Sequence, residues 1–140
     1  MPGTELFGEE EKKEVMDVLN TGVLFRFNHD AQRQGHWKAK DFEAEVADFC
    51  NAKYGLAVSS GSTAVNTMLA ACGVGYGDEV IVPPFTYIAT TEAVLLAGAL
   101  PVFAEIDDTL CMSAEGIRAV ISPKTKAILL NYPSNPTGSS

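Results

Sequence analysis

The stretch SSGSTAVNT, residues 59–67, holds residue types that proteins use to bind a phosphate group. It lies between the apolar runs GLAV and MLAAC, so it is expected to lead from a strand into a helix. The N–H groups of a helix's first turn lack partners within the helix, and the helix dipole adds positive potential there. Gly61 leaves room for an anion, and Ser62 and Thr63 add hydroxyl donors. Serine and threonine are also ordinary N-cap residues that need no ligand, so local chemistry leaves both interpretations open.

A second stretch, VPPFTYIATTEAV at residues 82–94, places aromatic rings beside a strand end. Its two prolines end strand pairing and form a rigid corner, because proline lacks an N–H and fixes φ. The corner projects Phe85 and Tyr87, and an aromatic ring held there can stack on a flat heterocycle. The alternative is that both rings only cover the edge of the sheet.

The elements that must position these residues alternate regularly along the chain. Strands are expected at LAVS, EVIVP, PVFAEI and KAILLN, and helices at STAVNTMLAAC, ATTEAVLLAGA and SAEGIRAVI. Short apolar strands separated by helices indicate an α/β fold with a mainly parallel sheet and helices on both faces. In such sheets ligands bind beyond the carboxyl ends of the strands, where SSGST and Tyr87 are expected to lie.

The N-terminal region has a different pattern. EEEKKEVMDVLNTG is typical of a charged helix that Gly22 ends, and VLFRFNHDAQRQGHWKAK, which has no clean period, is interpreted as a loop. A second helix is expected in DFEAEVADFCNAKYG, with Asp41 as its N-cap. We therefore divide the chain into residues 1–40, an N-terminal helix and loop, and residues 41–140, an incomplete large domain.

Composition excludes several classes of function. The 140 residues carry a net charge of −8, which disfavours binding to nucleic acid or to an anionic membrane. The three cysteines form no CxxC pair, so neither a disulfide framework nor a metal site is indicated. The N-terminus lacks the pattern of a signal peptide, no apolar run approaches the length of a membrane span, and no phosphate-loop motif of a kinase occurs. A cytoplasmic location is expected.

Three motifs in order carry a family resemblance: the serine-glycine turn, GDEVIVPPFTY and AGALPVFAEID. With them the chain resembles, from about Leu6 to Leu130, the DegT/DnrJ/StrS sugar aminotransferases, which are fold-type I enzymes dependent on pyridoxal 5'-phosphate (PLP). The segments ELFGEEEKKEV, FRFN and TLCMSAEGIRAVI look most like the branch that aminates C8 of an octulosonate sugar for lipopolysaccharide, the 8-amino-3,8-dideoxy-manno-octulosonate transaminases.

This resemblance implies a role for particular residues. Ser62 and Thr63 would hold the cofactor phosphate with Gly61 permitting close approach, and Tyr87 would stack on the pyridine ring. FRFN matches a loop near the substrate, where Arg26 would meet an anionic sugar or the carboxylate of the donor. The alternative for Arg26 is an arginine that is solvated or paired with a surface acid. Residues 41–140 would be the incomplete PLP-binding large domain, and residues 1–40 would include the substrate-side loop.

The sequence departs from the family pattern at two places. The family's SSGT reads SSGST here, so Ser62 stands for the threonine and keeps a hydroxyl. The tail NYPSNPTGSS instead resembles the NPTG motif of amino-acid aminotransferases, in which the asparagine contacts the 3'-oxygen of the cofactor; Asn135 would be that residue. A turn rich in proline, glycine and serine is the alternative, and the role of Asn135 stays open.

The resemblance implies transfer of an amino group from an amino acid, with glutamate as the expected donor, to a keto or aldehyde sugar in cell-envelope or secondary-metabolite biosynthesis. It also implies a homodimer. No lysine matches the Schiff-base position, so no catalytic residue is assigned and the chain alone is expected to be inactive as an N-terminal portion of the enzyme. Two alternatives remain: a fragment of a fold-type I amino-acid aminotransferase, and a non-catalytic binding or oligomerising module.

Overall fold

A computed structural model describes residues 3–139, which divide into two compact units, residues 3–57 and residues 58–139. The boundary predicted between residues 40 and 41 falls inside helix α3 (Lys38–Phe49), and the assignment of roles to the two predicted parts stays a prediction.

The N-terminal unit consists of helices joined by loops. After a 3-10 turn, η1 (Thr4–Leu6), come α1 (Glu9–Thr21), α2 (Asp30–Arg33) and α3. Glutamates 9, 10 and 11 fill the first turn of α1, where negative charge complements the helix dipole. Gly22 ends α1 in the left-handed conformation with φ of 67°, as the sequence predicts.

Two local expectations in this unit are wrong. The segment interpreted as a loop contains α2 and the start of α3. Helix α3 begins at Lys38 with Trp37 in the N-cap position, so Asp41 lies in the first turn rather than at the cap. The carboxylate of Asp41 still lies where the helix dipole favours negative charge.

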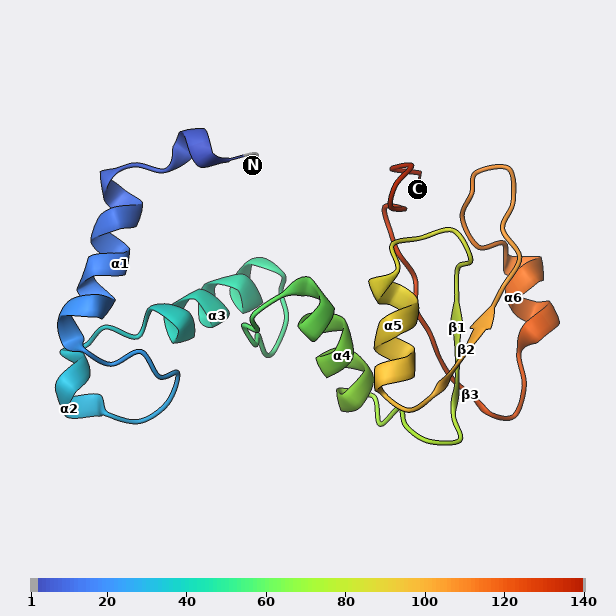
Figure 1. The fold of residues 1–140 in the computed structure, drawn as a ribbon, viewed down its shortest axis with the longest axis horizontal. Coiled ribbons are helices and arrows are strands. Elements are labelled where there is room, and N and C mark those ends of the chain that lie inside the picture. Colours follow the sequence, from blue (N-terminus) through green and yellow to red (C-terminus); the bar gives the residue numbers. More distant parts are fainter. Residues whose placement is uncertain (1–2, 140) are drawn as a thin grey trace. The chain divides into compact units, whose positions relative to one another are not determined.

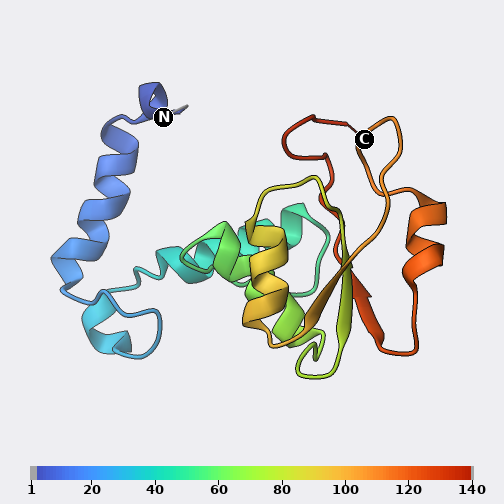
Figure 2. The ribbon, with the colours of Figure 1, turned by 45° about the vertical axis from the view of Figure 1, so that its right-hand side comes forward.

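The second unit contains a parallel sheet of three strands in the order β2-β1-β3. Its elements are α4 (Gly61–Ala71), β1 (Glu79–Val82), α5 (Ala89–Leu96), β2 (Leu100–Phe103), α6 (Ala114–Val120) and β3 (Thr125–Ile128). Figures 1 and 2 show α5 on one side of the strands and α6 on the other, and α4 packs against α5. Within residues 3–139, no helix combines the length and the apolar character needed to cross a membrane.

The core of this unit lies around the central strand. Val80 and Val82 are fully buried and cluster with Leu69 of α4 and Val94 of α5. Successive side chains of a strand point to opposite faces, so Ile81 belongs to the other face, and it is fully buried as well. Strand β1 is therefore buried on both faces, as expected for the middle of a parallel sheet.

The strand predicted at LAVS, residues 56–59, is wrong. These residues lie in no strand of the described structure. Instead of joining a ladder, the amide of Ala57 donates a hydrogen bond of 3.0 Å to Oε1 of Glu43. The SSGST turn therefore follows a loop and not a sheet strand, although it opens a helix as predicted.

Candidate functional site

Helix α4 begins with a serine cap. Ser60 has extended backbone angles, and its Oγ accepts a hydrogen bond of 3.2 Å from the amide of Thr63. The hydroxyl of Thr63 lies 2.9 Å from the same Oγ. The capping role considered for this stretch is thus filled by Ser60, which engages both the amide and the hydroxyl of Thr63.

The next two amides remain available. Within residues 3–139, the N–H groups of Gly61 and Ser62 have no hydrogen-bond acceptor, and the same holds for the Ser62 hydroxyl. A Cβ placed on Gly61 would meet no protein atom within 4 Å. Neither packing nor backbone strain therefore requires glycine at position 61, and the open space over the helix N-terminus suits an anion.

This open space is part of a cavity of about 380 Å³. Its lining consists of Gly61, Ser62, Val65, Tyr87, Ala89, Thr90, Asn131 and Asn135. All of these side chains are uncharged, so no carboxylate in the described lining repels an anion. The cavity combines unpaired amide donors at one helix start with an aromatic ring and amide side chains.

The structure brings three of the predicted site residues together. Gly61, Ser62 and Tyr87 line the same cavity, with Tyr87 contributed by the corner between β1 and α5. Thr63 does not line the cavity. Phe85, which belongs to the same corner as Tyr87, does not line it either. The binding roles of all these residues remain predictions.

Arg26, the predicted substrate residue, lies in the N-terminal unit and is paired with an acid. Its Nε donates to Glu43 Oε1 at 3.3 Å and its Nη2 donates to Glu43 Oε2. The guanidinium also lies 4.9 Å from the ring centre of Phe27. Its hydrogen bond to Glu43, together with the bond from the Ala57 amide, holds the pKa of Glu43 below its ordinary value. An anionic substrate at Arg26 must therefore compete with Glu43.

Sequence reasoning missed four residues of the cavity, the polar Thr90 and Asn131 and the apolar Val65 and Ala89. Asn131 directly follows the apolar run AILL, whose first two residues belong to β3, and Thr90 lies in the first turn of α5. Ligands of parallel sheets bind beyond the carboxyl ends of the strands, and this rule points to Asn131 as well as to SSGST and Tyr87. Asn135, whose role the sequence left open, lines the cavity too.

Comparison with known proteins identifies the family. The model of the DegT/DnrJ/EryC1/StrS aminotransferase family matches residues 6–131. The chain belongs to this family. The resemblance found in the sequence is confirmed, whereas the octulosonate branch remains a prediction.

Two curated members of the DegT family show the range of its relatives. The chain is 48% identical over 93 residues to UDP-N-acetyl-3-dehydro-alpha-D-glucosamine 3-aminotransferase of Acidithiobacillus ferrooxidans, covering 66% of this chain and 25% of that protein. It is 45% identical over 120 residues to GDP-perosamine synthase of Vibrio cholerae, covering 85% of this chain and 30% of that protein. This DegT-family chain thus spans between a quarter and a third of the length of these relatives.

Solved structures confirm the fold class. The Streptococcus pneumoniae protein Spr1654, assigned as a sugar aminotransferase, matches with a TM-score of 0.75 and 31% identity, over 87% of this chain and 29% of that one. That protein has been solved in apo, PMP and PLP forms. The predicted α/β fold of fold-type I aminotransferases is therefore confirmed for this member of the DegT family.

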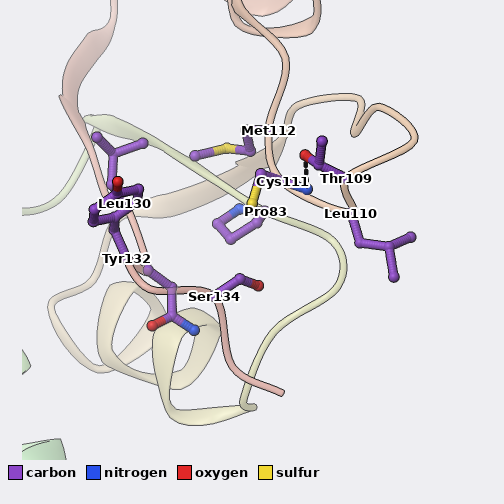
Figure 3. Close-up of a pocket in the computed structure, with 9 residues that line it drawn as sticks. Pro83, Thr109, Leu110, Cys111, Met112, Leu130, Tyr132 and Ser134 are labelled. Atoms are coloured by element: carbon purple, nitrogen blue, oxygen red, sulfur yellow. Dashed lines mark hydrogen bonds between the residues drawn. The ribbon is translucent and has the colours of Figure 1, made fainter. Parts of the chain in front are cut away.

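A second cavity of about 220 Å³ lies next to the first in this DegT-family chain and shares Asn131 with it. Figure 3 shows its mostly apolar lining, with Pro83 opposite Leu130 and Tyr132. The amide of Cys111 donates to the Thr109 hydroxyl at 3.3 Å on the far side. No helix start contributes to this lining among the described residues, so it lacks the anion-binding character of the first cavity.

Proposed function

We propose that residues 58–139 form part of a PLP site, the part that holds the phosphate and one face of the ring, in an enzyme that aminates a sugar. The observation that carries this proposal is the common cavity of Gly61, Ser62 and Tyr87. Membership of an aminotransferase family supports it, because the chemistry of this family requires the cofactor.

The residues present fit the cofactor. The free amides of Gly61 and Ser62 would bind the phosphate, assisted by the dipole of α4, and Thr63 would contribute once its hydroxyl left Ser60. The ring of Tyr87, which is 60% exposed, would stack on the pyridine. When bound, PLP supplies an electron sink for the amino-acid substrate. The contribution of this chain is to bind and orient the cofactor.

The substrate that we propose is a keto or aldehyde sugar, with an amino acid such as glutamate as donor. The names of the two relatives contain a UDP-linked and a GDP-linked sugar, which supports a sugar acceptor. The octulosonate sugar suggested by ELFGEEEKKEV and FRFN is a more specific alternative for the acceptor. A coupled assay of the whole enzyme with a nucleotide-linked keto sugar and with an 8-oxo octulosonate would distinguish the two acceptors.

We further propose that residues 1–140 do not catalyse transamination by themselves. Covalent cofactor chemistry needs a lysine, and none of the described residues that line the cavity is a lysine. Lys124 directly precedes β3 and Lys126 lies within it, and neither lysine lines the cavity. Addition of the remaining part of a family member should restore turnover, whereas activity of the isolated chain would contradict this proposal.

Calorimetric titration with pyridoxamine 5'-phosphate tests the cofactor site directly. This ligand keeps the phosphate and ring but does not condense with surface lysines. Gly61→Ala should weaken binding at least tenfold without lowering the unfolding temperature, because the new methyl group would fill only the anion space. Gly75→Ala is the matched control, since its Cβ also meets no atom within 4 Å and it lies outside the cavity. Equal affinity of both variants and the parent would refute the proposed site.

A second candidate function has one specific observation in its favour. Asn135 of the NPTG segment lines the cavity although it lies outside the residues that the family model matches. An asparagine in that place favours the cofactor contact of amino-acid aminotransferases. The sugar enzyme remains the first proposal, because the family match covers residues 6–131.

We also propose a cytoplasmic homodimer that binds neither nucleic acid nor membranes. The charge of −8 supports the last two points. Large apolar side chains at the outer strands, such as Phe103 on β2 and Ile128 on β3, are 52% and 43% exposed, which favours burial against further protein. Light scattering of the whole enzyme would measure its mass directly.

A further inference from the structure

A chain of hydrogen bonds leads from the end of β3 to the wall of the cavity. Asn131 Nδ2 donates to Thr86 Oγ1 at 2.8 Å. Thr86 Oγ1 in turn lies 3.3 Å from Thr90 Oγ1. Thr86 belongs to the corner that carries Tyr87, and Thr90 lines the cavity while being only 8% exposed. This series of hydrogen bonds therefore ends at the hydroxyl of a buried residue that lines the cavity.

The available donors and acceptors give this series of hydrogen bonds a direction. The NH₂ group of Asn131 can only donate, so the Thr86 oxygen must accept. If Thr86 then donates to Thr90, the proton of Thr90 is left for an acceptor in the cavity. If Thr90 donated to Thr86 instead, the Thr86 proton would have no acceptor among the described residues, and Thr86 does not line the cavity. In the first order every hydroxyl proton has a partner within the site once a ligand is bound, whereas the second order leaves the proton of the half-buried Thr86 to solvent.

We propose that Thr90 is an additional binding residue that donates its hydroxyl proton to an oxygen of the cofactor, and that Asn131 is the positioning residue that sets the direction of this donation. The proposal rests on the proposed function, because it takes the occupant of the cavity to be a pyridoxal-type phosphate ester. Hydrogen bonds in such a chain polarise one another, which strengthens the terminal donor. The acceptor is either a phosphate oxygen or the 3'-oxygen attached to the pyridine ring, called the ring oxygen below.

Substitution of Thr90 tests the hydroxyl itself. Thr90→Val keeps the shape but removes the donor, so pyridoxamine 5'-phosphate should bind about tenfold more weakly. Thr90→Ser restores the donor and should bind within about twofold of the parent chain. Thr91→Val is the matched control, because Thr91 is the next residue of α5 and does not line the cavity. If Thr90→Val does not fold, Thr90→Ala provides the same comparison.

Reversing the direction of these hydrogen bonds tests the role of Asn131. The carboxylate of N131D can only accept, so Thr86 would donate to it and Thr90 would donate to Thr86, which turns the Thr90 proton away from the ligand. N131D alone should therefore weaken binding. In the N131D background, Thr90→Val should cause less than about a twofold further loss, because the donor is already withdrawn. A purely structural or purely electrostatic role of Asn131 would leave the full tenfold effect of Thr90→Val.

The ligands distinguish the two possible acceptors and separate this inference from the proposed function. A loss shared by pyridoxamine and its phosphate ester identifies a ring oxygen, and a loss confined to the phosphate ester and inorganic phosphate identifies a phosphate oxygen. Either result supports the proposal. Unchanged binding by Thr90→Val would overturn it while leaving the cofactor site intact. If the unsubstituted chain bound none of the ligands, the proposed function and this inference would both fail.

Discussion

Arg26 and Glu43 form an ion pair within the N-terminal unit, although neighbouring residues along the chain are exposed. The guanidinium uses two nitrogens on the two carboxylate oxygens, and Glu43 accepts a further bond from the amide of Ala57. Glu43 is only 8% exposed, so its charge depends on these donors. The pair joins the FRFN loop, α3 and the segment that leads out of this unit.

The pH dependence of stability should report on this pair. The hydrogen bond from Arg26, and secondly that from Ala57, lowers the pKa of Glu43 below 4.5. A carboxyl whose folded-state pKa is lowered stabilises the fold fully above about pH 5, and this contribution is lost as the pH falls through the folded-state pKa. Glu43→Gln should therefore be less stable than the parent chain at pH 7, and the difference should shrink toward pH 3.

Urea unfolding at several pH values would measure that difference. Glu45→Gln is the matched control, because Glu45 is an exposed glutamate of the same helix with no hydrogen-bond partner among the described residues. Its stability should follow the parent chain at every pH. A gap between Glu43→Gln and the parent that stayed constant from pH 7 to pH 3 would argue against the ion pair.

Arg33 should prove essential for the shape of the FRFN loop. It is 6% exposed and donates to the carbonyl oxygens of Asn28 at 2.7 Å, Phe27 at 3.3 Å and Phe25. Its guanidinium also lies 4.1 Å from the ring centre of Trp37. Lysine has a single nitrogen and cannot reproduce this fork, so Arg33→Lys should cost about 2–3 kcal/mol in the N-terminal unit.

Hydrogen exchange of the amides in residues 25–28 would reveal the loosened loop in Arg33→Lys. The same substitution at the exposed Arg118 of α6 serves as control and should change nothing measurable. Unchanged exchange rates in Arg33→Lys would show that the three carbonyl contacts do not hold the loop.

Substitution of the two serines on either side of Gly61 should affect different properties, stability for Ser60 and ligand binding for Ser62. Ser60 caps α4 through the amide of Thr63, so Ser60→Ala should reduce the free energy of unfolding by about 0.5–2 kcal/mol. Ser62 has no hydrogen-bond partner in the described structure but lines the cavity. Ser62→Ala should keep the stability within about 0.5 kcal/mol and weaken binding of pyridoxamine 5'-phosphate.

Thermal unfolding and calorimetric titration of both variants, side by side, would check this contrast. Each variant serves as the control for the other, because both lose one hydroxyl at the same helix start. Equal losses of stability in the two would mean that the N-cap is not confined to Ser60.

Asn135→Ala should weaken the binding of pyridoxamine as well as of its phosphate ester. The residue lines the cavity from the tail segment, and an amide side chain there can donate to the ring oxygen. We expect a loss of about fivefold for both ligands. Thr137→Ala is a control from the same segment that does not line the cavity. No change in either affinity would favour the interpretation of this tail as a turn only.

The elements with a strong pattern could be predicted from the sequence, and those governed by tertiary contacts could not. Gly22 ends α1 and the apolar run of β1 is buried on both faces, because local periodicity and glycine placement decide both. The predicted strand at residues 56–59 fails because the Ala57 amide bonds to Glu43, a residue far away along the chain. Propensity cannot anticipate such a partner.

The site followed the same division. That Gly61, Ser62 and Tyr87 lie together could be predicted because glycine, serine and aromatic residues at element ends carry a local signal, and their binding roles stay predictions. Arg33, by contrast, stands in a polar stretch, and nothing in its neighbours predicts a buried cation that three carbonyl oxygens hold. Asn131 carries the signal of a strand end, but its place beside the corner of Tyr87 depends on the order of the strands in the sheet.

The cavity wall is assembled from three separate segments, at the start of α4, at the corner before α5 and after β3. Such a wall exists only while the sheet is formed, so a ligand that fits it binds the native state and not the unfolded chain. By thermodynamic linkage, a ligand present at 100 times its Kd adds about 2.7 kcal/mol to the native state. If the cofactor proposed above is that ligand, its presence would also leave less of the polypeptide unfolded and open to proteolysis.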